Sequence, residues 1–191
     1  MPEETYFEID EPTDWVIVED LMKQRMEKSK VLSRIKLLAL DIDGVFTDGG
    51  MYYDDNGEAF KLFNTKDGMA LQIARENDIF IAVITSEDKE MNLKRMEKVK
   101  VEHLFQGVSD KYFVLKKLAS NMGISFSNIA YVGDDINDEA CMLASGLSFA
   151  PSNAEEKAKK SADFLLSRKG GSGAVREAVE RIIDFNKRIG G

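Results

Sequence analysis

The segment Leu38-Ala39-Leu40-Asp41-Ile42-Asp43-Gly44-Val45-Phe46-Thr47-Asp48 runs from an apolar strand directly into carboxylates. Asp41 and Asp43 follow the apolar run and are separated by one residue. Ligands of open α/β sheets bind at the carboxyl ends of the strands, so both side chains are expected where a reacting group would sit. Paired carboxylates there favour Mg²⁺, which binds through one or two carboxylates together with a substrate phosphate.

Along the rest of the chain, apolar runs of strand length alternate with segments of helical periodicity. Strands are predicted at residues 36–40, 79–84, 101–105, 129–132, 147–150 and 164–166. Helices are predicted at residues 66–76, 89–99, 111–121, 137–145, 154–161 and 174–188. This alternation is typical of a parallel sheet with crossover helices. We therefore expect an α/β fold with a Rossmann-like parallel sheet flanked by helices.

One insertion interrupts the alternation after the first strand. Asn56-Gly57 lies between two short segments of strand character, residues 51–53 and 58–63. Asn-Gly is a strong hairpin signal because glycine adopts positive φ without a steric penalty. We expect a small β-hairpin flap here. A polar stretch near residues 28–34 is expected to separate an N-terminal segment, residues 1–33, from a main domain, residues 34–191.

Composition and charge argue against several classes of function. The chain has 191 residues, of which 43% are hydrophobic and 31% charged, as in ordinary globular proteins. Its net charge of -8 argues against a nucleic-acid-binding surface. Its uncharged apolar runs are far shorter than the roughly 20 residues of a membrane-spanning helix, and the acidic N-terminus lacks the pattern of a secretory signal. We expect a cytoplasmic protein that binds neither nucleic acid nor membrane.

A second acidic cluster, GDDIND at residues 133–138, also follows a predicted strand. If the two strands are neighbours in a parallel sheet, Asp134 lies close to Asp41 and completes one cation site. The alternative is that these groups cap the helices that follow, because Asp is favoured at N-caps and in first turns. Taken individually, Asp48, Asp135 and Asp138 fit such a structural role.

Two further strand ends supply groups that bind phosphate. Thr85 and Ser86 follow the predicted strand at residues 79–84, and backbone N–H groups at a helix start bind phosphate oxygens. Lys111 opens the next helix, and a lysine there neutralises phosphate charge. Taken singly, Thr85 fits an ordinary cap and Lys111 an exposed helix residue. Their positions after successive strands favour the functional interpretation.

Together these segments resemble the four motifs of the haloacid dehalogenase superfamily of phosphotransferases. Residues 41–48 are similar to its first motif, Thr85 to its second, Lys111 to its third and residues 133–135 to its fourth. The resemblance extends from Arg34 to about Phe185. It implies a phosphoric monoester hydrolase of the phosphatase type with a fold like that of the superfamily.

The resemblance also implies roles for these residues. Asp41 attacks phosphorus and forms an aspartyl-phosphate, while Asp43 protonates the leaving alcohol and later activates water. Mg²⁺ is held by the Asp41 carboxylate, the Asp43 backbone carbonyl and Asp134. The phosphoryl oxygens are bound by Thr85, Ser86 and Lys111.

Two further segments, FNTKDG at residues 63–68 and GGSGAVRE at residues 170–177, are similar to phosphatases of 2-keto-3-deoxy sugar acids that have no cap domain. In that branch the members typically form homotetramers, in which the hairpin and the C-terminal tail help close a neighbouring subunit's site. The resemblance therefore implies a small-molecule sugar acid phosphate as substrate and homotetramers as the assembly. The alternative is that the Gly-rich residues 170–173 form only a flexible connection.

The substrate is indicated by residues at which this chain differs from some members of that branch. Octulosonate 8-phosphate phosphatases tend to carry Thr-Gly-Arg where this chain has Thr-Ser-Glu at residues 85–87, and Arg where it has Lys66. Glu87, Arg95 and Lys98 instead resemble the phosphatases of nonulosonate 9-phosphates. A glutamate accepts hydrogen bonds from sugar hydroxyls, and two cations meet a carboxylate, although solvated helix charges are the alternative for Arg95 and Lys98. We expect these residues and Lys66 to bind N-acylneuraminate 9-phosphate or its deaminated analogue, with 3-deoxy-D-manno-octulosonate 8-phosphate as the alternative.

The N-terminal segment carries one more resemblance. Residues 9–14, IDEPTD, lead into an amphipathic stretch, as at the end of acylneuraminate cytidylyltransferases, which implies a fused or associated cytidylyltransferase of sialic acid metabolism. An unrelated acidic segment is the alternative. The related domain of animal cytidylyltransferases looks chiefly like an assembly module, so a non-catalytic tetramerisation domain is a further hypothesis. The chain nevertheless retains all the residues of the proposed site, which favours an enzyme.

Overall fold

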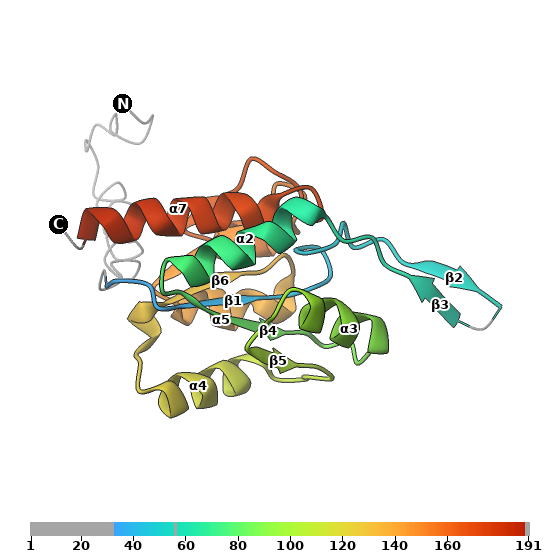
Figure 1. The fold of residues 1–191 in the computed structure, drawn as a ribbon, viewed down its shortest axis with the longest axis horizontal. Helices are drawn as coiled ribbons and strands as arrows, with labels where there is room; N and C mark the ends of the chain where they lie inside the picture. The colour runs from blue at the N-terminus through green and yellow to red at the C-terminus, as the bar shows by residue number, and fades with distance from the viewer. Residues whose placement is uncertain (1–32, 56, 190–191) are drawn as a thin grey trace, which may run out of the picture. The chain divides into compact units, whose positions relative to one another are not determined.

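The computed structural model describes residues 33–55 and 57–189. Within them, six strands form one parallel sheet in the order β5-β4-β1-β6-β7-β8 (Figure 1). The strands are β1 (Leu37–Leu40), β4 (Phe80–Ile84), β5 (His103–Phe105), β6 (Ile129–Val132), β7 (Leu147–Ala150) and β8 (Phe164–Leu165). The expected parallel α/β fold is confirmed.

Helices cover both faces of this sheet. They are α2 (Thr65–Glu76), α3 (Glu90–Lys98), α4 (Lys111–Met122), α5 (Glu139–Ala144), α6 (Glu156–Ser161) and α7 (Ala174–Ile189), with 3-10 turns η2 (Phe126–Asn128) and η3 (Ile136–Asp138). The residues of β1 alternate between two buried cores: Leu38 and Leu40 pack with residues of α2 and α7, and Leu37 and Ala39 with residues of α4, α5 and α6. The central strands are apolar throughout because both of their faces are buried.

The predicted hairpin is present after β1 and projects beyond the sheet (Figure 1). β2 (Tyr52–Asp54) pairs antiparallel with β3 (Gly57–Phe60), and the rings of Tyr52 and Phe60 stack with their centroids 4.5 Å apart. Gly57 takes a φ of +118°, which explains the glycine of the turn. The second strand ends at Phe60 instead of the predicted residue 63, because its pairing with β2 ends at the pair of Tyr52 and Phe60; the buried Lys61 follows.

Other boundaries differ from the predicted ones by local chemistry. The helix expected over residues 137–145 begins as η3 and becomes α-helical only at Glu139. The side chain of Asp135 accepts a hydrogen bond from the N–H of Ile136, which fixes the tight first turn. β5 begins at His103 instead of residue 101, because the N–H of Val101 donates to the carbonyl of Met96 as α3 ends.

Of the predicted N-terminal segment, residues 1–33, all but the last residue lie outside the described residues, and so does the stretch that resembles a cytidylyltransferase. No helix in the described part of the chain combines the length and apolar character that crossing a membrane requires.

Candidate active site

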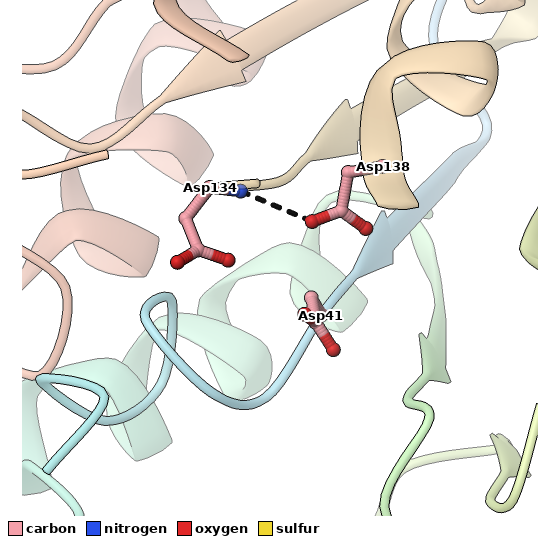
Figure 2. Close-up of side chains that lie close together, drawn as sticks. All are labelled: Asp41, Asp134 and Asp138. Carbon is pink, nitrogen blue, oxygen red and sulfur yellow. Dashed lines mark hydrogen bonds between the residues drawn. The ribbon is translucent and has the colours of Figure 1, made fainter. Parts of the chain in front are cut away.

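The sheet topology brings the motif residues to one edge. β1 lies between β4 and β6 in parallel register, with Leu40 opposite Val83 on one side and Val132 on the other. The residues that follow these strands therefore meet. Asp41, Asp134 and Asp138 offer carboxylate oxygens that all lie within 4.8 Å of one another. Figure 2 shows these three side chains close together.

Asp138, to which the sequence analysis gave a structural role, is the third member of this carboxylate cluster. It accepts hydrogen bonds from Lys111 Nζ at 2.8 Å, the Tyr131 hydroxyl at 2.7 Å and the backbone N–H of Asp134 at 3.1 Å. Asp138 thus contacts Lys111, Tyr131 and the backbone of Asp134 at the same time. Its position in the first turn after β6 was the available signal, but that position fits a helix cap equally well.

Lys111 lies against the predicted nucleophile. Its Nζ is 2.9 Å from Asp41 Oδ2, and both side chains are almost completely buried. Burial by itself lowers the pKa of the Lys111 ammonium, but the carboxylates of Asp41 and Asp138 raise it above its usual value. Lys111 is therefore a buried cation at Asp41, not an exposed helix residue.

The carboxylate cluster holds more negative charge than Lys111 offsets. Burial first, and then the charge of Asp138, raise the pKa of Asp41 to about 7 even though Lys111 opposes the change. Burial followed by the charges of Asp41 and Asp138 raises the pKa of Asp134 to about 8. Oxygen ligands crowded in this way suit a hard divalent cation, which would relieve their mutual repulsion.

Gly44 makes room for this cluster. It has a φ of +79°, and a Cβ at this position would overlap the carboxylate of Asp134. The glycine after Asp43 in the first motif is thus needed because the loop that follows β1 approaches the loop that follows β6 closely. Residues from the C-terminal part also close on this loop: the N–H of Gly171 donates to the carbonyl of Val45 at 3.0 Å, and Gly170 packs against the carbonyl of Gly44.

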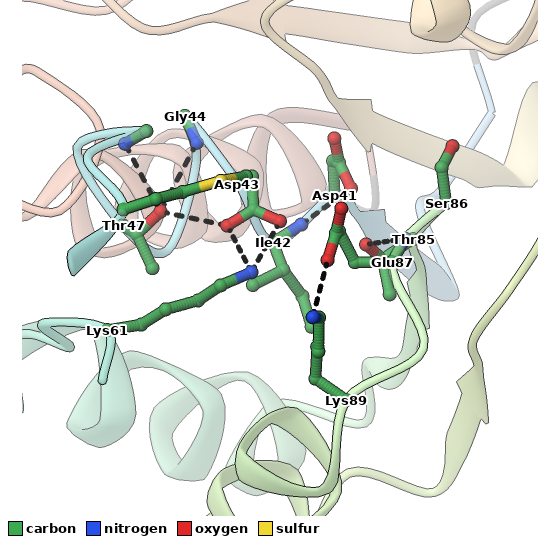
Figure 3. Close-up of polar contacts among 12 residues, drawn as sticks. Asp41, Ile42, Asp43, Gly44, Thr47, Lys61, Thr85, Ser86, Glu87 and Lys89 are labelled. Atoms are coloured by element: carbon green, nitrogen blue, oxygen red, sulfur yellow. Dashed lines mark hydrogen bonds and ion pairs between the residues drawn. The ribbon is translucent and has the colours of Figure 1, made fainter. Parts of the chain in front are cut away.

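Asp43 stands outside the carboxylate cluster. Both of its carboxylate oxygens lie 2.8 Å from Nζ of Lys61, and the Thr47 hydroxyl is 3.4 Å from one of them (Figure 3). Lys61 is not among the site residues that the sequence indicated. No spacing rule connects it with Asp43, since it follows the second strand of the hairpin.

Thr85, Ser86 and Glu87 form the loop after β4 (Figure 3). Thr85 is buried, and its hydroxyl accepts a hydrogen bond from the N–H of Glu87 at 3.3 Å. The Ser86 hydroxyl accepts a longer one from the Asn137 side chain, at 3.5 Å. The Glu87 carboxylate lies 4.0 Å from Lys89 Nζ. The loop thus joins the second motif to the turn that carries the fourth.

The remaining predicted substrate-binding residues lie on α2 and α3. The Arg95 guanidinium donates to the carbonyl of Asn64 at 3.3 Å and sits 5.6 Å from the centroid of the Phe63 ring. Lys66 is exposed in the first turn of α2. Arg95 and Lys98 line a groove of about 490 Å³ together with Thr65, Gly68, Met69, Gln72, Arg75, Val99 and Lys100. This groove is strongly basic, and its lining includes neither Asp41 nor Asp43.

The chain is similar to one family of hydrolases and to phosphatases of known name. Residues 53–178 match the family described as haloacid dehalogenase-like hydrolase. The chain is 38% identical over 149 residues to the 3-deoxy-D-manno-octulosonate 8-phosphate phosphatase KdsC of Escherichia coli (strain K12), covering 78% of this chain and 79% of that protein.

Two solved structures are similar in fold. The cobalt-bound deoxy-D-mannose-octulosonate 8-phosphate phosphatase (YrbI) of Haemophilus influenzae matches with a TM-score of 0.78 and 34% identity, over 82% of this chain and 91% of that one. The 3-deoxy-D-manno-octulosonate 8-phosphate phosphatase of Moraxella catarrhalis, in complex with magnesium ion, phosphate ion and KDO, matches with a TM-score of 0.78 and 33% identity, over 82% of this chain and 90% of that one.

The family match begins after β1 and the first motif, and the relatives each cover about four fifths of this chain. Among the described residues, the hairpin is the only inserted element between β1 and α2, where a cap domain would otherwise stand. The chain therefore belongs to the haloacid dehalogenase-like hydrolases, as a phosphoric monoester hydrolase of the capless branch that resembles the 3-deoxy-D-manno-octulosonate 8-phosphate phosphatases.

Proposed function

We propose that this chain hydrolyses a sugar acid phosphate through an aspartyl-phosphate on Asp41, with Mg²⁺ as cofactor. The observation that carries the proposal is the contact of Asp41 with Lys111 inside a buried carboxylate cluster. A scaffold has no need of buried charges, which are costly unless they serve a purpose. The non-catalytic tetramerisation domain is for this reason the weaker hypothesis.

The carboxylates of Asp41 and Asp134 and the backbone carbonyl of Asp43 would hold the metal. Crowding of the cluster, the raised pKa of Asp41 and Asp134, and the close approach of the Asp134 carboxylate that Gly44 permits all fit a divalent cation. The related M. catarrhalis enzyme was solved with magnesium and phosphate ions. When bound, Mg²⁺ offsets the repulsion between an anionic nucleophile and an anionic substrate.

The chemistry proceeds in two displacements. A carboxylate oxygen of Asp41 attacks phosphorus, the bond from phosphorus to the sugar oxygen breaks, and Asp43 gives its proton to that oxygen. Water then attacks the aspartyl-phosphate, and Asp43 takes a proton from that water as the acyl-phosphate bond breaks. Inorganic phosphate leaves and both aspartates return to their initial state. Thr85, Ser86 and Lys111 bind the phosphoryl oxygens.

Two substrates are candidates. The relatives favour 3-deoxy-D-manno-octulosonate 8-phosphate, because the proteins similar to this chain over most of its length bear that name. Glu87 favours a nonulosonate 9-phosphate of the sialic acid type, since a carboxylate in the loop after β4 accepts hydrogen bonds from sugar hydroxyls. Arg95 and Lys98 would then meet the substrate carboxylate from the basic groove.

We further propose a homotetramer in which the hairpin and the C-terminal tail contribute to neighbouring sites. Five apolar side chains of the hairpin region are exposed in the single chain: Met51, Tyr52, Tyr53, Phe60 and Leu62. An isolated two-stranded hairpin is marginally stable in water, so association with a second copy is physically favourable. A fused or associated cytidylyltransferase would act after dephosphorylation, on the free sugar acid.

The decisive experiment measures phosphate release from both sugar acid phosphates, with Mg²⁺ and with EDTA. We expect Mg²⁺-dependent turnover of one of them, and no turnover by Asp41→Asn with its fold and assembly intact. Release from neither substrate by the wild type would contradict the proposal and support the scaffold. Faster release from the nine-carbon substrate would favour the Glu87 argument over the relatives.

A further inference from the structure

The ion pair between Lys61 and Asp43 joins the hairpin to the site. Lys61 directly follows β3, and its side chain is fully buried, with Nζ 2.8 Å from each Asp43 oxygen. The Asp43 side chain remains partly accessible, with 22% of its surface exposed. One partner is thus anchored inside the protein, and the other reaches toward the solvent side of the site.

The geometry restrains Asp43. A symmetric contact to both oxygens fixes the plane of the carboxylate as well as its position, and a hydrogen bond to a charged group is among the stronger ones in proteins. Thr47 adds a weaker contact at 3.4 Å to Oδ1, and the same hydroxyl accepts from the N–H groups of Gly44 and Gly49. The first-motif loop and the hairpin therefore hold the carboxylate between them.

Burying a lysine ammonium costs free energy that the fold must offset elsewhere. A residue whose only task was to lead the chain from the hairpin into α2 would not need a charge at this point. The cation also does not belong to the carboxylate cluster, which already contains Lys111. Its two contacts to Asp43 indicate a role at that side chain.

We propose that Lys61 is a positioning residue for Asp43, so that the hairpin sets the orientation of the general acid and base. This inference rests on the proposed function, in which Asp43 protonates the leaving oxygen. Proton transfer in the transition state requires the Asp43 carboxyl group within hydrogen-bond reach of that oxygen. Protonated Asp43 gives its proton from one oxygen while the other contacts Lys61, and the carboxylate so formed makes both contacts. An Asp43 side chain released from Lys61 would spend less time in the productive orientation.

The test compares Lys61→Met with Asp43→Asn and the double variant, using kcat/KM because it reports the step in which the leaving group departs. Three substrates separate the possibilities: the sugar acid phosphate turned over by the wild type, glycerol phosphate and p-nitrophenyl phosphate. Glycerol needs a proton to leave but carries no carboxylate, whereas p-nitrophenolate leaves without one.

We expect Lys61→Met to lower kcat/KM on the order of 10-fold or more for both alkyl phosphates and distinctly less for p-nitrophenyl phosphate, since general acid catalysis typically contributes at least that much. Asp43→Asn should show the same substrate dependence. Adding Lys61→Met to Asp43→Asn should change kcat/KM little further. Lys61→Arg should restore part of the rate, and Lys116→Met, an exposed lysine of α4, should behave as the wild type.

Thermal unfolding of each variant checks that it is folded, and Lys61→Arg keeps the test valid if Lys61→Met is not. A loss confined to the sugar acid phosphate would overturn the inference, because Lys61 would then bind the substrate carboxylate. Equal losses on all three substrates, or fully additive losses in the double variant, would also overturn it. If Asp43→Asn itself showed no dependence on the leaving group, the assigned role of Asp43 would fail instead.

Discussion

Gly44 shows how a single backbone position controls the metal site. Because a Cβ there would overlap the Asp134 carboxylate, Gly44→Ala must displace that group. We expect the Mg²⁺ concentration for half-maximal activity to rise on the order of 10-fold or more, as with other changes that disturb ligand orientation. Gly123→Ala is the matched control, since Gly123 also has positive φ but has open space around it. An unchanged Mg²⁺ requirement in Gly44→Ala would contradict this account of the site.

The single side chain of Glu87 separates the two candidate substrates. If it accepts hydrogen bonds from a nonulosonate, Glu87→Ala should reduce kcat/KM for that substrate more than for p-nitrophenyl phosphate. Each lost hydrogen bond to a charged group is worth about 1.5–3 kcal/mol, which corresponds to roughly 10-fold or more in rate. Glu90→Ala, an exposed carboxylate at the start of α3, is the control. Equal losses on both substrates would remove Glu87 from substrate recognition.

At the scale of elements, the junction of α2 and α7 explains two of the segments that carry the family resemblance. Asp67 is completely buried, and it accepts hydrogen bonds from the N–H groups of Gly173 and Arg176 at the start of α7. Burial raises the pKa of Asp67, and these hydrogen bonds oppose the change. The acceptor at the start of α7 thus lies on a different helix, α2.

Glu177 secures the next contact of α7. Its carboxylate accepts hydrogen bonds from the N–H groups of Ser167 and Arg168 and pairs with Arg181. Burial alone would raise the pKa of Glu177, but these hydrogen bonds lower it below its ordinary value of 4.5. A depressed folded-state pKa adds stability that is present above the unfolded pKa and lost as the pH falls through the folded one.

Glu177→Gln should therefore lower the free energy of unfolding by about 1 kcal/mol at pH 7, and by less at a pH below the folded-state pKa of Glu177, where the wild-type carboxylate is protonated as well. Urea titrations at the two pH values measure this difference. Glu180→Gln removes only an exposed ion pair with Arg176 and serves as the control. A deficit that stayed constant with pH would show that the charge of Glu177 does not matter.

At the scale of the whole molecule, the exposed hairpin predicts assembly. Light scattering should give a mass near four times 21.4 kDa for the wild type. Tyr53→Ser, which removes a side chain that is 68% exposed, should shift the population toward smaller species without lowering the stability of the main domain. Phe113→Ser changes an equally exposed side chain on α4 and should leave the mass unaltered. A monomeric wild type would contradict the prediction.

The sequence by itself determined the parallel sheet, because strands buried on both faces must be apolar at every position, as in Ile129–Val132. It also indicated that Asp41 and Asp134 meet, since both follow such strands. Only the tertiary structure decided that Asp138 joins them, that Lys61 holds Asp43 and that Asp67 caps α7. Those partners lie on separate elements or in ambiguous turns, and side-chain pairing between them leaves no periodicity that a linear reading could detect.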